Sequence, residues 1–366
     1  PIGIGVSGGS DSLALLELAA KWAQERGRDV IALTFDHGLR AEAAGEAADV
    51  KSHADNLNVT HCTLTWDAPQ TGQKLARRAR HGALAEAVRS IGGNCLMLGH
   101  TCDDQRETFL IRARQGSHWY GLGCMRDVSV SPVWPEGRGV HVVRPLLNET
   151  RSDLQDRLRA CGSTWASDPS NENAVYERVR VRQVLVENTH LQTRIGLIQK
   201  QLSFLRAVED IRVGAWLTQN VRVDAGGQMD VDLGNLSSES LARGLSLLLQ
   251  CVSGKDMPPR GPACADLAQA LLSNTEFRGR TLSGVDIRRF GNTVKLKREV
   301  AAIVRDCEQS EVWDNRFERL SSGASKIDRI GTTPDADPVT HPQGGDWRCL
   351  VPIRLAAFVD MLSPSR

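Results

Sequence analysis

The sequence lacks any apolar run near the roughly 18 residues that a membrane-spanning helix needs, and its N-terminus lacks the basic-then-apolar pattern of a secretory signal. It also lacks a charge excess, because 45 basic residues oppose 44 acidic ones and leave a formal net charge of +1. Any nucleic-acid surface must therefore come from arginines gathered on one face. These absences exclude a membrane-spanning protein, and they neither support nor exclude RNA binding.

Cysteine pairs of the form Cys-x-x-Cys are absent as well, although nine cysteines are spread between Cys62 and Cys349. An odd, scattered set of this kind is typical of reduced thiols, so we expect a cytoplasmic protein. Because an apolar strand begins almost directly after Pro1, we also expect the chain to lack its natural start.

Apolar and charged residues make up 41% and 24% of the 366 residues, which is typical of a globular protein with two or three domains. In the first half, apolar segments with strand character alternate with segments of helical spacing. Such alternation predicts an α/β fold, in which helices flank a parallel sheet and ligands bind at the carboxyl ends of its strands. The expected strands lie at 2–6, 29–35, 59–64 and 94–98, and the expected helices at 12–26, 42–57, 72–91 and 103–115.

The alternation stops near residue 185, and the remainder predicts a smaller region of mixed α and β structure. We expect helices at 190–219 and 237–252, a β-rich stretch at 281–305, a loop at 321–346 and a last strand at 349–358. The expected domains are a first domain at 1–185, a helical linker with a small α+β domain at 186–320, and a loop-rich linker with a C-terminal strand segment at 321–366.

A glycine-rich loop lies directly between the first expected strand and the first expected helix. Glycines let successive backbone N–H groups turn toward a phosphate, and the helix that follows adds the positive end of its dipole. The loop lacks the lysine of a Walker A motif and the G-x-G-x-x-G spacing of a dinucleotide site. Asp11 would repel phosphates unless Mg²⁺ bridged them. The alternative is an ordinary turn in which Asp11 and Ser12 cap the helix. The candidate phosphate-binding residues are Ser7, Gly8, Gly9, Ser10, Asp11 and Ser12.

Histidines and acids follow the second and fourth expected strands, and a parallel sheet would bring them to the same edge as the glycine loop. Crowded carboxylates repel one another unless a metal, a cationic substrate or arginines neutralise them. Acids at a solvated helix N-terminus are the alternative. The candidate catalytic residues are Asp11, Asp36, His37, His100, Asp103, Asp104 and Glu107.

The loop resembles the SGGxDS pyrophosphate loop of the N-type ATP pyrophosphatases, and later segments resemble the hallmarks of the tRNA(Ile)-lysidine synthetase family. The matching segments are DHGLR at 36–40, ARRAR at 76–80, GHTCDDQRET at 99–108, RPLL at 144–147 and DPSN at 168–171. Arginines at 178, 180 and 182 follow, and their spacing by two suits an extended segment laid on phosphates better than a solvated helical face, which is the alternative. The agreement spans about residues 3–185.

This resemblance implies an adenine nucleotide alpha hydrolase-like catalytic domain at 1–185 and a tRNA-binding domain at 186–320. It implies that the wobble cytidine of an isoleucine tRNA with a CAU anticodon is adenylated by ATP, and that free L-lysine then displaces AMP to give lysidine. Asp11 and Asp104 are the expected Mg²⁺ ligands, and His37 or His100 would take a proton. The expected tRNA-binding residues are Arg77, Arg80, Arg112, Arg144, Arg151, Asn171, Arg178, Arg180 and Arg182. No membrane and no obligate protein partner are expected.

Two residues depart from the family pattern: Gln115 stands where arginine is common, and His118 stands where glycine is common. They put the substrate contacts of that turn in question. Two rival functions stay open. One is another N-type pyrophosphatase acting on tRNA, such as a thiolase, which the absence of Cys-x-x-Cys disfavours. The other is a nucleotide-binding module without turnover, which the retained acids and histidines disfavour.

Overall fold

The computed structural model describes residues 1–38, 43–66, 72–166, 175, 177–273, 277–303, 312–320, 342 and 346–363. The chain forms two compact units, and each is described by itself. Unit 1 holds Pro1–Ser131 and Gly139–Arg206, and unit 2 holds Pro132–Arg138 and Ala207–Arg366. Helix α8 (Thr189–Asn220) runs from the first unit into the second. The domain boundaries expected from the sequence remain predictions, because contact-based units need not coincide with domains.

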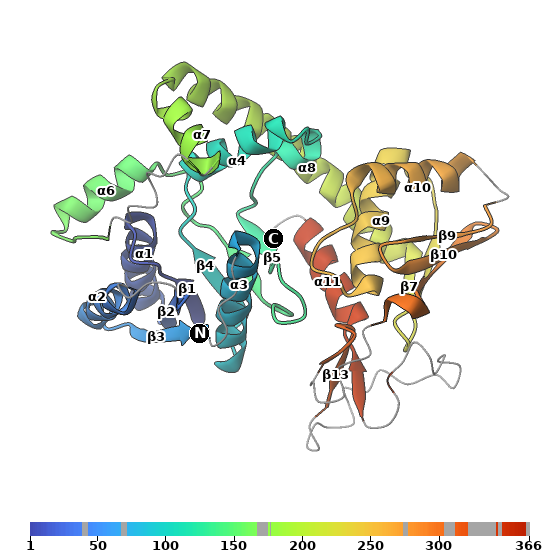
Figure 1. The fold of residues 1–366 in the computed structure, drawn as a ribbon, viewed down its shortest axis with the longest axis horizontal. Coiled ribbons are helices and arrows are strands. Elements are labelled where there is room, and N and C mark those ends of the chain that lie inside the picture. Colours follow the sequence, from blue (N-terminus) through green and yellow to red (C-terminus); the bar gives the residue numbers. More distant parts are fainter. Residues whose placement is uncertain are drawn as a thin grey trace. The chain divides into compact units, whose positions relative to one another are not determined.

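Unit 1 is built on a six-stranded, mostly parallel sheet. The predicted parallel sheet flanked by helices is confirmed (Figure 1), and β5 and β6 add to the four strands that were expected. Strands β3, β2, β1, β4 and β6 run parallel, and β5 pairs with β6 in the opposite direction at one edge. Their bounds, in sheet order, are β3 (Thr60–Thr65), β2 (Val30–Asp36), β1 (Ile2–Gly5), β4 (Cys95–Leu98), β6 (His141–Val143) and β5 (Val128–Val130). The inner strands β1, β2 and β4 are covered on both faces, which is why they are nearly continuous apolar runs in the sequence.

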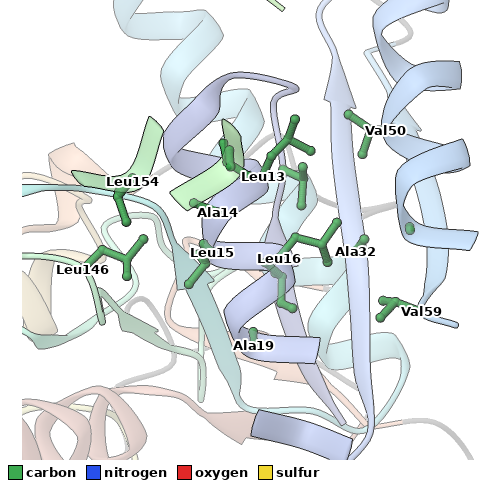
Figure 2. Packing of buried hydrophobic residues seen from close by; sticks show 14 residues of the cluster. Leu13, Ala14, Leu15, Leu16, Ala19, Ala32, Val50, Val59, Leu146 and Leu154 are labelled. Atoms are coloured by element: carbon green, nitrogen blue, oxygen red, sulfur yellow. The ribbon is translucent and has the colours of Figure 1, made fainter. Parts of the chain in front are cut away.

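Helices cover both faces of this sheet. On one face, Leu13, Leu15 and Leu16 of α1 pack with Leu154 of α6 and Val50 of α2 in one apolar cluster (Figure 2). On the other face, Leu84 and Val88 of α3 pack against Leu33 and Leu96 of the strands. The helices of this unit besides α8 are α1 (Ser10–Arg26), α2 (Ala43–Asn56), α3 (Gln73–Ser90), α4 (Cys102–Arg114), α5 (Trp119–Leu122), α6 (Arg151–Ala160) and α7 (Glu177–Val186). Burial of each large apolar side chain contributes about 1.5–3 kcal/mol, so these clusters fix the helices that border the strand ends.

Unit 2 contains a separate antiparallel sheet, which confirms the predicted mixed C-terminal region. Its strands, in order, are β7 (Val221–Val223), β8 (Met229–Asp232), β11 (Thr293–Arg298), β10 (Val285–Phe290) and β9 (Arg280–Leu282). Helix α9 (Ser238–Ser253) packs against β10 and β11, and α10 (Gly261–Ser273) packs against α9. A 3-10 turn follows the sheet at Val300–Ala302. A second sheet holds β12 (Val312–Trp313), β13 (Phe317–Arg319) and β14 (Trp347–Cys349).

The predicted strand at 349–358 is wrong, because a helix, α11 (Val351–Leu362), occupies that stretch. Its buried residues are Val351, Arg354, Phe358 and Leu362, and their spacing of three and four is helical. Pro352 stands at the start of this helix, where its missing N–H costs no hydrogen bond. Most of the predicted loop at 321–346 lies outside the described residues.

A short loop of the first half, Pro132–Arg138, is part of the core of unit 2. Trp134 donates its indole N–H to the carbonyl of Asn315 at 2.6 Å and its backbone N–H to the carboxylate of Asp256 at 2.7 Å. The guanidinium of Arg354 lies over the Trp134 ring, 4.7 Å from its centroid. Both Val133 and Trp134 are buried. The loop joins β5 to β6, so two neighbouring strands of unit 1 are connected through unit 2.

Among the described helices, none combines the length and the apolar character that crossing a membrane requires.

Candidate active site

The glycine-rich loop follows β1, and hydrogen bonds of its own serine side chains hold it in place. Ser12 accepts a hydrogen bond from the backbone N–H of Ser7 at 3.1 Å and donates one to the carbonyl of Gly9 at 2.9 Å. Gly8 has a φ of +82°, a left-handed conformation that favours glycine. Gly9 occupies the cap position of α1, so the alternative in which Asp11 and Ser12 cap this helix is wrong. No side chain of the described residues caps α1, which leaves its first N–H groups available to an anion.

The turn after β4 lies directly against this loop. A Cβ added to Gly99 would come within 2.8 Å of the backbone carbonyl oxygen of Asp11, a distance that only a displacement of the backbone could relieve. Glycine at this position therefore permits the close approach of the second motif to the first.

A cleft of about 710 Å³ opens in unit 1 at the carboxyl ends of β1, β2 and β4. Fourteen of the predicted site residues line it: Ser7, Gly9, Ser10, Asp11, Ser12, Asp36, His37, Arg77, Arg80, His100, Asp104, Arg151, Arg178 and Arg182. Six other predicted residues in the described ranges do not contribute to its lining: Gly8, Asp103, Glu107, Arg112, Arg144 and Arg180. Asn171 lies outside the described residues, as do Leu39, Arg40 and Asp168 of the family motifs.

Arginines neutralise the acids of α4. One oxygen of Asp104 accepts the backbone N–H of Thr101 at 2.9 Å, and the other accepts Arg178 Nη2 at 2.7 Å. Glu107, whose side chain is 1% exposed, accepts Arg178 Nε at 2.6 Å and Arg182 Nε at 2.7 Å. Burial favours the protonated form of Asp104, but the charge of Arg178 and the Thr101 hydrogen bond outweigh it and lower the pKa of this carboxyl. Asp104 is thus held ionised.

The predicted extended geometry of the arginine run at 178–182 is wrong, because these residues belong to α7. Arg178 and Arg182 are four residues apart and share the face that meets Asp104 and Glu107. Arg180 is exposed and donates to the carbonyl of Val175 at 2.8 Å. The run therefore divides between the cleft and the surface.

Asp11 is paired with Arg151, the first residue of α6. Arg151 Nε donates to Asp11 Oδ2 at 2.9 Å, and Arg151 Nη2 lies 3.6 Å from Asp104 Oδ1. Burial raises the pKa of Asp11, and the Arg151 charge opposes this effect. Asp103 accepts the backbone N–H of Arg151 at 2.8 Å and pairs with Arg106 at 3.0 Å. Its carboxylate therefore anchors the start of α6, and its predicted catalytic role remains a prediction.

The two predicted histidines differ in their surroundings. His37 lies in the cleft against Phe35, with ring centroids 4.8 Å apart. His100 is half-buried, and desolvation lowers its pKa to about 4, a direction that Arg144, Arg77 and Arg178 reinforce and Asp104 opposes. His100 is therefore neutral near pH 7.

Arg144 and Arg112 hold local structure. Arg144 donates to Ser129 Oγ at 2.9 Å, and burial lowers its pKa to about 10. Arg112 donates to the carbonyl of Gly121 at 2.6 Å.

The two residues that depart from the family pattern lie at the ends of helices. Gln115 occupies the C-cap position of α4, and His118 occupies the N-cap position of α5.

Besides Phe35, which directly precedes the DHGLR segment, four polar or aromatic residues of the cleft lining were missed by sequence reasoning: Thr34, Glu46, Gln155 and Trp165. Gln155 carried a usable signal, because it stands four residues after Arg151 on the same helix face. Its side-chain amide donates to Ser10 Oγ of the glycine loop at 3.4 Å. The other three follow no motif.

The carboxylates of Asp11 and Asp104 are the kind of oxygen ligand that Mg²⁺ prefers, and both line the cleft. Across the described ranges, no three His, Cys, Asp or Glu side chains form a group that could hold a metal ion by themselves. Mg²⁺ is commonly held by one or two carboxylates together with the phosphates of a substrate. The residues present therefore fit a Mg²⁺ ion that arrives with a nucleotide.

A helix-flanked parallel sheet with this loop at its strand ends defines a nucleotide-binding protein of the PP-loop class, and the family described as "PP-loop domain" matches residues 1–189. The tRNA(Ile)-lysidine synthase of Hyphomonas neptunium is 45% identical over 299 residues, which cover 82% of each chain. That of Caulobacter vibrioides is 34% identical and covers 87% of this chain and 73% of its own. That of Ruegeria pomeroyi is also 34% identical and covers 86% and 75%. The chain belongs to the tRNA(Ile)-lysidine synthase family.

Proposed function

We propose that the chain is a ligase that joins L-lysine to C2 of the wobble cytidine of an isoleucine tRNA with a CAU anticodon. ATP adenylates the base with release of pyrophosphate, and lysine then displaces AMP. The observation that carries the proposal is the convergence of loop 7–12, Asp104 and two histidines on one cleft, in a chain that is 45% identical to a synthase of this name.

The phosphates of ATP would lie on the N–H groups of the glycine loop and the start of α1. Asp11 and Asp104 would hold Mg²⁺, which supplies charge neutralisation for the triphosphate and the departing pyrophosphate when it is bound. The attacking oxygen belongs to the cytosine carbonyl, so positioning the base and excluding water are the tasks left to the chain's own residues.

Lysine attacks only with a neutral ε-amino group, so a side chain must accept a proton. His37 and His100 both line the cleft, and we favour His37 because a pKa of about 4 makes His100 a weak proton acceptor. His100 remains suited to orienting a partner through a hydrogen bond. The ammonium of the incoming lysine would be attracted by the acids of the cleft, including Glu46, which the sequence did not single out.

The wobble base lies in a single-stranded loop, where taking a base out of its stack costs least. Arginines would hold the backbone of this loop, and Arg180 on the exposed side of α7 is the clearest candidate. Arg77, Arg80, Arg112 and Arg144 remain predicted tRNA-binding residues.

The test is incubation with ATP, labelled lysine and a tRNA bearing a CAU anticodon, with the same tRNA bearing GAU as the control. We expect label in the CAU tRNA alone, together with pyrophosphate and AMP. The matched variant Asp11→Asn should lose pyrophosphate release while filter-retained tRNA stays within about twofold, because the change removes a charge from the phosphate loop and not from the tRNA surface. Pyrophosphate release without lysine in the tRNA would contradict ligation, and absence of release would favour a non-catalytic binding module.

A further inference from the structure

Helix α6 is fixed beside the glycine loop. Thr150 caps it by accepting the backbone N–H of Asp153 at 3.1 Å, and Asp103 accepts the backbone N–H of Arg151 at 2.8 Å. Leu154 and Leu158 are buried in the same apolar cluster as the leucines of α1. The start of α6 is therefore held on two sides, by α4 through Asp103 and by α1 through the core.

One face of this helix is directed at the phosphate loop. Arg151 and Gln155 are four residues apart, and both line the cleft. Arg151 Nε lies 2.9 Å from Asp11 Oδ2, and Gln155 Nε2 lies 3.4 Å from Ser10 Oγ. Both side chains thus contact consecutive residues of the loop, and both offer N–H donors there.

The guanidinium of Arg151 lies close to three carboxylates. Its guanidinium lies 3.6 Å from Asp104 and 3.9 Å from Glu107, in addition to its contact with Asp11. Its side chain is 25% exposed, so the cation borders the space that a ligand would enter. A planar guanidinium at this position can donate to phosphate oxygens in the same way that it donates to carboxylates.

We propose that α6 is a second phosphate-binding element of the site, in which Arg151 and Gln155 bind the phosphates of ATP rather than the backbone of tRNA. The inference rests on the proposed use of ATP. It reassigns Arg151 from the tRNA surface to the nucleotide, and it gives Gln155 a role. Arg151 contacts Asp11 and Gln155 contacts Ser10, where a nucleotide's phosphates would lie, which is why ATP is the anion that they would meet.

The test compares ATP affinity and tRNA affinity in Arg151→Ala, Arg151→Lys and Gln155→Ala. ATP binding with Mg²⁺ and without tRNA is measured by titration calorimetry, and tRNA binding without ATP is measured by filter retention. Removal of a charge-assisted hydrogen bond should raise the dissociation constant for ATP about tenfold or more in Arg151→Ala, less in Arg151→Lys, and about threefold in Gln155→Ala. The matched control is Arg157→Ala, which removes an exposed arginine of the same helix and should change neither constant.

Weakened ATP binding with tRNA affinity within about twofold supports the proposal. Weakened tRNA binding with unchanged ATP affinity overturns it, as does tighter ATP binding in Arg151→Ala, which would mean that Arg151 only blocks Asp11. Should Arg151→Ala fail to fold by its thermal melting curve, the lysine and Gln155 variants decide by the same criteria. Absence of lysine transfer in the unaltered protein would refute the proposed ligation and leave the comparison of ATP affinities intact.

Discussion

Two histidines, the buried His81 and the half-buried His100 of the cleft lining, are kept neutral by their surroundings. His81 is 2% exposed, and burial together with the charges of Arg80 and Arg77 lowers its pKa to about 3. Within the described part of the chain, neither of its ring nitrogens has a hydrogen-bond partner, and the same holds for Nδ1 of His100. These imidazoles resist protonation, because the new positive charge would lie close to the arginines and would be poorly solvated.

This arrangement predicts a loss of stability in mild acid. The folded pKa values lie below the ordinary value of 6.5, so the unfolded chain takes up protons first as the pH falls, and stability present above pH 6.5 is lost toward pH 4. At pH 5.5 the lowered pKa of each histidine reduces the free energy of unfolding by about 1.4 kcal/mol relative to its value well above pH 6.5. We expect His81→Phe to reduce the fall in melting temperature between pH 7.5 and pH 5.5. The exposed His190→Phe is the control, and an equal fall in all three proteins would contradict the prediction.

At the scale of single residues, the sequence predicted which side chains come to the same edge of the sheet, but it did not predict which of them form ion pairs. Asp36, His37, His100 and Asp104 line one cleft because each lies at or after the carboxyl end of a parallel strand, and strand ends can be located from apolar patterns. That Arg178 pairs with Asp104 could not be read from the sequence, since 74 residues separate them. Only the packing of α7 on α4 decides that contact.

Among the elements, the turn between β12 and β13 depends on one buried acid. Asp314 accepts Arg298 Nε and Nη2, both at 2.9 Å, and Arg316 Nε at 2.7 Å. The exposed fractions of these three side chains are 1–3%. Both arginines depend on this carboxylate for the compensation of their buried charge.

Asp314→Ala should therefore destabilise unit 2 by about 3–5 kcal/mol, the range for removing one partner of a buried ion pair. The comparison is Asp286→Ala, which breaks an ion pair with Arg288 in which the arginine side chain is 65% exposed, and which should cost less than about 1 kcal/mol. Urea unfolding followed by tryptophan fluorescence measures both. Equal midpoints for the two variants would show that the buried group contributes no more than the exposed one.

Element types were predictable where length and period agreed. The long amphipathic helices and the buried strands of unit 1 satisfied both criteria. The stretch at 349–358 misled because a short apolar run fits either a buried strand or a buried helix, and tertiary packing chose α11. The arginine run at 178–182 misled because a spacing of two suggested an extended segment, whereas Arg178 and Arg182 are four residues apart in α7 and share one face of this helix.

At the scale of the whole molecule, a net charge of +1 means that tRNA capture must depend on a few local arginines. Arg180→Ala should weaken tRNA binding and reduce the slope of log affinity against log salt by about 1, while ATP affinity stays unchanged. Arg178→Ala is the matched variant from the other side of α7, and it should lower ATP-dependent pyrophosphate release because it uncovers Asp104 and Glu107. Filter binding at several salt concentrations measures the slope, and an unaltered slope in Arg180→Ala would remove this residue from the tRNA surface.

The seating of Trp134 in the core of unit 2 has a topological consequence. The chain passes between the units at 131/132, 138/139 and 206/207, so a cut at 206/207 leaves residues 132–138 of unit 2 on the fragment that carries unit 1. A fragment that ended at residue 206 would keep the loop between β5 and β6 but lose the rest of unit 2. Val133 and Trp134, which are buried in the intact chain, would then be exposed to solvent. The two halves of this enzyme are therefore interleaved along the chain, and neither can be excised as a single uninterrupted segment.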